Sequence, residues 1–195
     1  MDKNKHQKIN AGLYLVSTPI GNMQDITLRA LNILKKSDVI LCEDSRRSSK
    51  LISFFNIKKK LFPYHKFNEE KVSNKIVNYI KQNKIISLIS DAGTPTISDP
   101  GIILINKCIK ENLQVYPVPG PSAINSAMSI SGFNDKYLFY GFLTKNEKKL
   151  EKILKKLSNI EYSIVFFVPS SKINFYILKF KKYFLDRKIL IAKEM

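Results

Sequence analysis

Short apolar runs alternate with amphipathic segments along most of the chain, and few folds accommodate such a pattern. Four of the runs have the length and composition of buried strands: 13–17, 38–42, 85–89 and 114–116. Between them, apolar residues recur at helical spacing, as Ile76, Val77 and Ile80 do in a helix expected over 68–83. Strands that alternate with helices are typical of α/β domains, so the sequence predicts a mostly parallel sheet.

Local signals predict where individual helices begin. Asp25 is expected to cap the helix that follows the first strand, because a carboxylate accepts well from the free N–H groups there. Asp99 followed by Pro100 has the pattern of a cap and a first helical position. A further helix is expected from Ser122.

Beyond Gly132 the pattern changes to aromatic-rich and Lys-rich segments. The expected elements are a strand over 137–143, a helix over 146–158, a strand over 162–168, a helix over 172–183 and a strand over 187–193. We therefore expect a polar tail over 1–11, an N-terminal α/β domain with the ligand loops over 12–133, and the start of a second α/β domain over 134–195. The second domain is expected to be truncated, since its last strand would end the chain with an unpaired edge.

The chain is strongly basic, with 33 Lys and Arg against 16 Asp and Glu and a net charge of +17. Hydrophobic residues make up 44%, which is typical of a packed globular protein. A compositional bias towards Lys accounts for part of the surplus. The remainder favours a polyanionic partner, because nucleic-acid binders gain affinity by neutralising phosphates.

Several classes of protein are disfavoured by what the sequence lacks. No apolar run reaches the ~18 residues of a membrane span, and the polar N-terminus lacks the apolar core of a signal peptide. Cys42 and Cys108 belong to no CxxC or Cys/His cluster, which disfavours a zinc site and a disulfide scaffold. We expect a cytoplasmic protein without a membrane partner or a metal.

Three loops rich in Gly and Pro follow predicted strands: 17–22, 90–101 and 116–123. Open α/β sheets bind ligands at the carboxyl ends of their strands, although each loop alone is equally compatible with ordinary turn chemistry. No GxGxxG or GxxxxGK[ST] motif is present, so nothing indicates a pyrophosphate cradle. Asp91 is suited to ribose hydroxyls or a cationic ligand, which favours a nucleoside over a triphosphate.

A fourth cluster, Cys42–Ser48, places two carboxylates beside two of the four arginines in the chain. Arg46 and Arg47 suit phosphate, since guanidinium presents a planar fork of donors. A salt-bridged helix start explains the cluster about equally well. His65 has no Cys or second His near it in sequence, so a hydrogen-bonded structural role is expected for it rather than metal binding.

Five ordered motifs resemble a known family: LYLVSTPIGN at 13–22, CEDSR at 42–46, SDAGTP at 90–95, SDPG at 98–101 and VPGPS at 118–122. Together they closely resemble the ribosomal RNA small-subunit methyltransferase I family of tetrapyrrole-methylase-like enzymes. The resemblance implies a two-domain α/β fold, S-adenosylmethionine as cofactor and commonly a homodimer. It also implies a substrate, the ribose 2′-hydroxyl of a cytidine in the decoding region of small-subunit ribosomal RNA or of the 30S particle.

The same resemblance implies roles for individual residues. Expected at the cofactor are Pro19, Asp91, Thr94, Ser122, Ala123 and Phe167. Expected to face the RNA are Asn22, Arg46 and Arg47. Glu43 and Asp44 are the candidates for removing the proton of the hydroxyl, with stabilisation of a helix start as their alternative role.

The chain departs from the family at Ala192–Met195, where it stops within a motif that the family continues, and at Phe166–Lys172, which lacks a Glu, a His and an Arg of the family pattern. Two alternatives therefore stay open. One is a tetrapyrrole or precorrin methyltransferase, which shares the fold. The other is a truncated, non-catalytic RNA-binding remnant.

Overall fold

The computed structural model describes residues 9–193 and 195, and these form two compact units. The first unit extends to Ser122 and the second begins at Ala123. Most of the tail expected over 1–11 lies outside the described residues. The domain limits expected from the sequence, 12–133 and 134–195, remain a prediction.

The first unit is built on a parallel sheet of five strands in the order β3-β2-β4-β1-β5. The strands are β1 (Gly12–Val16), β2 (Val39–Cys42), β3 (Leu61–Pro63), β4 (Ile85–Ile89) and β5 (Val115–Val118). The expected α/β architecture with a parallel sheet is confirmed. Strand β3 is not predicted by the sequence pattern, because it has three residues and ends in Pro63.

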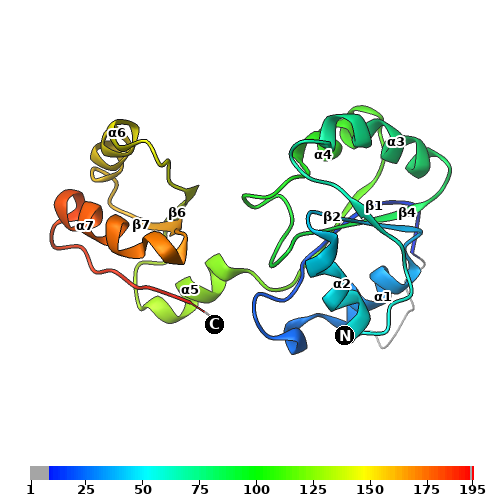
Figure 1. The fold of residues 1–195 in the computed structure, drawn as a ribbon, viewed down its shortest axis with the longest axis horizontal. Coiled ribbons are helices and arrows are strands. Elements are labelled where there is room, and N and C mark those ends of the chain that lie inside the picture. Colours follow the sequence, from blue (N-terminus) through cyan, green and yellow to red (C-terminus); the bar gives the residue numbers. More distant parts are fainter. Residues whose placement is uncertain (1–8, 194) are drawn as a thin grey trace. The chain divides into compact units, whose positions relative to one another are not determined.

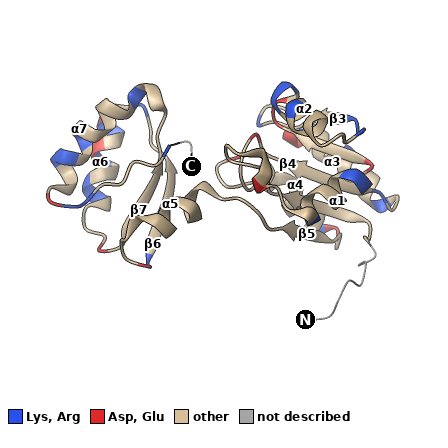
Figure 2. Cartoon of the chain, turned by 90° about the horizontal axis from the view of Figure 1, so that it is seen from below, with Lys and Arg blue, Asp and Glu red and all other residues tan. Residues whose placement is uncertain are grey.

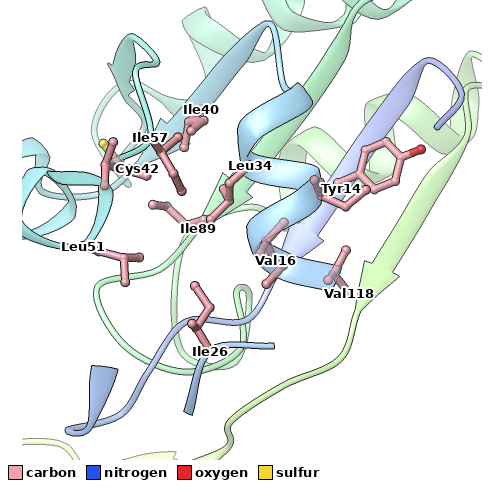
Figure 3. Packing of buried hydrophobic residues seen from close by; sticks show 13 residues of the cluster. Tyr14, Val16, Ile26, Leu34, Ile40, Cys42, Leu51, Ile57, Ile89 and Val118 are labelled. Atoms are coloured by element: carbon pink, nitrogen blue, oxygen red, sulfur yellow. The ribbon is translucent and has the colours of Figure 1, made fainter. Parts of the chain in front are cut away.

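Helices cover both faces of this sheet (Figure 1). The helices are α1 (Leu28–Lys36), α2 (Ser45–Phe54), α3 (Glu69–Lys81) and α4 (Ile102–Lys110). Leu34 of α1 and Leu51 of α2 pack with Ile40 and Ile89 of the sheet, as Figure 3 shows. On the opposite face, α3 and α4 bury their apolar sides against the sheet, so the helices after β1 and β2 lie across the sheet from those after β3 and β4.

Two helix starts differ from the sequence prediction. Asp25 does not cap α1, because it belongs to a short 3-10 turn, η1 (Met23–Asp25). Thr27 caps α1 instead, and its hydroxyl accepts from the N–H of Ala30 at 3.0 Å. Helix α4 begins after Gly101, whose φ of 137° turns the chain in a way that glycine tolerates best, so Asp99 is left outside the cap.

The second unit contains α5 (Ala123–Ser131), β6 (Tyr137–Phe142), α6 (Glu147–Leu157), β7 (Ser163–Phe167), η2 (Ser170–Lys172) and α7 (Ile173–Phe184). Strands β6 and β7 pair in parallel, and Leu150 and Leu154 of α6 are buried against Tyr176 and Phe180 of α7. Figure 2 shows basic residues along α6 and α7.

The prediction of a strand over 187–193 is wrong, since these residues pair with no described strand. An extended apolar segment becomes a strand only when a neighbouring strand offers hydrogen-bonding groups. Here Ile189, Leu190 and Ile191 instead line an apolar cavity of the second unit. None of the helices among the described residues is long and apolar enough to span a membrane.

Candidate functional site

The three Gly/Pro loops meet at the carboxyl edge of the sheet, because β4, β1 and β5 are neighbours. Thr18 and Gly93 exchange backbone hydrogen bonds of 2.9 and 3.0 Å, which ties the loop after β1 to the loop after β4. The hydroxyls of Ser17 and Thr94 lie 3.0 Å apart. Thr94 Oγ1 also donates to the carbonyl of Pro121 at 3.3 Å, so all three loops are joined.

The position of this loop cluster suits ligand binding. Strands β1 and β4 are adjacent, yet the helices that follow them pack on opposite faces of the sheet. Such a switch point leaves a crevice between the two loops at the carboxyl edge, which is where open α/β sheets bind their ligands. Asp91 is the first charged residue after β4 and so lies at this edge.

The N-terminus of α2 lies beside the same edge. Asp44 caps the helix, and its carboxylate accepts from the backbone N–H of Arg46 at 2.9 Å. The Arg46 side chain donates to the same carboxylate from Nε at 3.2 Å and from Nη2 at 2.9 Å. These hydrogen bonds lower the pKa of Asp44 to about 2, so it is ionised at neutral pH and engaged in holding Arg46.

Asp91 connects α2 to the loop after β4. Its Oδ1 accepts from the backbone N–H of Asp44 at 3.3 Å, and its Oδ2 lies 3.3 Å from Nη1 of Arg47. A candidate for cofactor binding, Asp91, thus contacts a candidate base, Asp44, and a candidate for RNA contact, Arg47. The sequence separates Asp91 from Asp44 by 47 residues, and only the order of strands makes them neighbours.

Two further carboxylates in this region have raised pKa values. Glu43 is exposed as a residue, but partial desolvation of its carboxyl group, together with the negative charges of Asp99 and Asp91, raises its pKa. Burial also raises the pKa of Asp99, and the negative charge of Asp91 adds to the shift. A carboxylate with a raised pKa is a stronger base than an ordinary one, which distinguishes Glu43 from Asp44.

A hollow of about 510 Å³ lies between the start of α2 and the loop after β4. It is lined by Glu43, Asp44, Ser45, Arg46, Arg47, Pro63, His65 and Asp91. A hydrogen-bonded structural role is expected for His65 from the sequence, but the structure places it in the wall of the hollow. Since β3 pairs with β2, the residues that follow Pro63 lie beside those that follow Cys42. The sequence pattern does not predict β3 and therefore does not predict this proximity.

The candidates for cofactor binding fall in both units. Pro19, Asp91, Thr94 and Ser122 belong to the loop cluster of the first unit, where Pro19 is buried. Ala123 and Phe167 belong to the second unit, where both line the apolar cavity of about 730 Å³. Asn22 is exposed and caps η1, accepting from the N–H of Gln24 at 3.0 Å.

The loop cluster suits a nucleoside with a positive charge better than a phosphate. Its charged side chains are the carboxylates of Asp91 and Asp99, and a carboxylate can accept from ribose hydroxyls or face a cation. At Gly120 a Cβ would lie 2.9 Å from Cβ of Ser17, so glycine permits this close approach of loops. The residues present therefore fit S-adenosylmethionine, an adenosine that carries a sulfonium.

Comparisons with known proteins agree with the geometry. Residues 12–188 match the family model "Tetrapyrrole (Corrin/Porphyrin) Methylases". The chain is 43% identical over 188 residues to the "Ribosomal RNA small subunit methyltransferase I" of Rickettsia prowazekii, covering 96% of this chain and 67% of that protein. It is 42% identical over 186 residues to the protein of the same name from Thermotoga maritima, covering 94% and 82%.

Solved structures of low sequence identity share the fold. A uroporphyrin-III-C-methyltransferase from Thermus thermophilus matches with a TM-score of 0.62 at 16% identity, covering 90% of this chain and 75% of that one. A diphthine synthase matches with a TM-score of 0.65 at 14% identity, covering 81% and 64%. At these identities the likeness concerns the fold alone.

Proposed function

We propose that the chain, which belongs to the tetrapyrrole methylase family and whose relatives described above are named ribosomal RNA small subunit methyltransferase I, methylates that RNA with S-adenosylmethionine. The finer part of the proposal is the acceptor, the ribose 2′-hydroxyl of a cytidine in the decoding region. This acceptor is what the sequence resemblance implies. The observation that carries the proposal of RNA methylation is the contact of Asp91 with the arginine-bearing start of α2.

The cofactor supplies a methyl group on a positively charged sulfonium. Asp91 and Thr94, held by their contacts in the loop cluster, are the residues proposed to bind and orient it, with Pro19 and Ser122 beside them. Ala123 and Phe167 stay candidates for apolar contact with it. Methyl transfer depends chiefly on holding the two reactants in line, so the rigidity of the joined loops serves the reaction directly.

Glu43 is the proposed acceptor of the hydroxyl proton. Its carboxylate lines the hollow, and its raised pKa makes it a better base than Asp44. Asp44 has a different task, because its oxygens cap α2 and hold the Arg46 guanidinium. Arg46 and Arg47 are proposed to contact RNA phosphates, and Asn22 is an exposed candidate for the same surface.

The names of the relatives favour ribosomal RNA over a tetrapyrrole, since eight relatives at 33–48% identity are all named ribosomal RNA small subunit methyltransferase I. The uroporphyrin enzyme shares the fold at only 16% identity. We also propose a homodimer, which the resemblance implies, and a cytoplasmic location, which the isolated cysteines favour.

The test is transfer of labelled methyl from S-adenosylmethionine to small ribosomal subunits that lack the modification. We expect incorporation into the RNA at one ribose, mapped by resistance of the adjacent bond to alkaline cleavage. Label on a tetrapyrrole with none on RNA would overturn the proposal. Label on a base rather than a ribose would overturn only the 2′-hydroxyl assignment.

A further inference from the structure

A tight turn beside the hollow holds an aromatic ring in solvent. Phe67, between β3 and α3, is 94% exposed, the largest value among the exposed large apolar residues of the described chain. Single exposed apolar residues are common on protein surfaces, so exposure alone indicates little. The ordered turn that carries Phe67 and the arginines near it indicate a function for the exposed ring.

The turn that carries Phe67 is well ordered by hydrogen bonds. Asn68 Oδ1 accepts from the N–H of His65 at 2.9 Å, and Asn68 Nδ2 donates to the carbonyl of Pro63 at 3.1 Å. The carbonyl of His65 accepts from the N–H groups of Asn68 and Glu69 at 2.9 and 3.0 Å. The backbone thus presents the Phe67 ring in a prearranged position, which reduces the entropy lost on binding.

The ring of Phe67 stands next to the wall of the hollow. Its centroid lies 6.1 Å from that of His65, with the two planes at 61°. His65 lines the hollow together with Arg46 and Arg47, and its Nδ1 is buried without a hydrogen-bond partner among the described residues. Buried polar atoms that lack partners are uncommon, and a ligand in the hollow would supply a partner for this one.

Phosphate-binding groups and an aromatic face are thus combined at one rim. Arg46 and Arg47 are exposed, and each guanidinium has more N–H donors than its carboxylate partner uses. Proteins that bind single-stranded nucleic acid pair cationic groups for the backbone with aromatic rings on which bases stack. We propose that Phe67, braced by His65, is a stacking platform for an unpaired RNA base adjacent to the nucleotide held in the hollow.

This inference rests on the proposed function, because it names how the same site recognises its RNA. It adds a recognition residue outside the five motifs of the sequence analysis. The ligand chemistry is a planar base in a single strand. A protein partner docking on Phe67 is the competing explanation, and it predicts unchanged RNA binding in variants of Phe67.

The test measures binding of the full chain to a twelve-residue oligocytidylate by fluorescence anisotropy at several salt concentrations. Phe67→Ala is expected to weaken binding about 5- to 100-fold, the range for loss of one stacked base. The dependence of affinity on salt should stay unchanged, because no phosphate contact is lost. Phe67→Tyr should bind like the unaltered chain, whereas Phe67→Leu should bind like Phe67→Ala.

Phe54→Ala is the matched control, because Phe54 is also exposed (61%) but ends the helix whose first turn lines the hollow. Its affinity should not change. The same oligomer with abasic riboses should bind the unaltered chain and Phe67→Ala equally weakly. Equal affinity of the unaltered chain and Phe67→Ala for oligocytidylate, or full affinity of Phe67→Leu, would overturn the inference.

Two assays distinguish failure of the proposed function from failure of the stacking platform. The binding assay needs no methyl transfer, and methylation of small subunits is measured alongside it on the unaltered chain. Absence of transfer with RNA binding still dependent on Phe67 would contradict the enzyme proposal and leave the platform in place. Transfer that is unaffected by Phe67→Ala at limiting RNA would contradict the platform alone.

Discussion

Arg47 and Asp91 join the start of α2 to the loop after β4, with Nη1 of the arginine 3.3 Å from Oδ2 of the aspartate. Asp91 also accepts from the backbone of Asp44, so one carboxylate contacts two positions of the 44–47 turn. A ligand that binds Asp91 therefore alters the surroundings of the arginines proposed for RNA. The proposed cofactor and RNA contacts therefore meet at this residue.

Replacing Asp91 tests its assignment to the cofactor. Asp91→Ala is expected to weaken cofactor binding at least tenfold, because a carboxylate that accepts from ribose or faces the sulfonium is lost. The fold should stay intact, since the Arg47 side chain is 71% exposed and an ion pair that open to solvent contributes only about 0–1 kcal/mol to stability. Titration calorimetry measures the cofactor affinity, with Glu111→Gln, a member of a surface ion pair with Lys81, as the control. An unchanged dissociation constant would remove Asp91 from the site.

The pH dependence of the reaction tests Glu43. A base must be deprotonated, so kcat/KM should fall as the pH drops through the raised pKa of Glu43, above the range of an ordinary glutamate. Glu43→Gln should lower kcat/KM by about 10²–10⁴ and abolish this acid limb. Cofactor affinity measured by calorimetry should be retained. If the variant keeps the acid limb, another group accepts the proton.

Replacing Gly101 tests whether this glycine, rather than Asp99, determines the start of α4. Its φ is 137°, and a Cβ there would lie 2.7 Å from Cδ2 of Leu88 and from Cγ2 of Thr96. Gly101→Ala should lower the free energy of unfolding by about 1–3 kcal/mol, because strained backbone and close contact add. Gly132→Ala is the control, since its φ is 62° with no atom within 4 Å. Urea denaturation that shows equal losses would contradict the steric argument.

Leu34 tests the packing of α1 on the sheet. The side chain has no exposed surface and lies within the cluster of Figure 3. Leu34→Ala should lower the free energy of unfolding by about 2–5 kcal/mol, through lost burial and the cavity that remains. Leu28→Ala, on the same helix but 86% exposed, should change it by less than about 0.5 kcal/mol. Thermal unfolding followed by circular dichroism compares the two variants.

Helix starts show where local signals mislead. Asp25 and Thr27 are both acceptable caps by residue type. Thr27 caps α1 because Asp25 lies within η1. Asp44 had two roles that the sequence could not separate. Its hydrogen bonds to Arg46 show that capping and holding the arginine occupy its oxygens, which leaves Glu43 as the proposed base.

The alternation of apolar runs with helical spacing by itself determined the α/β class, and the Gly/Pro loops determined where ligands are expected. These are local properties, because burial imposes a period on each segment wherever it packs. Strand order is different, since it depends on long-range pairing that no segment encodes alone. Only the tertiary structure placed β3 beside β2, brought His65 to the hollow and set Asp91 against Arg47. Residues far apart in sequence became one site because parallel strands end at a common edge.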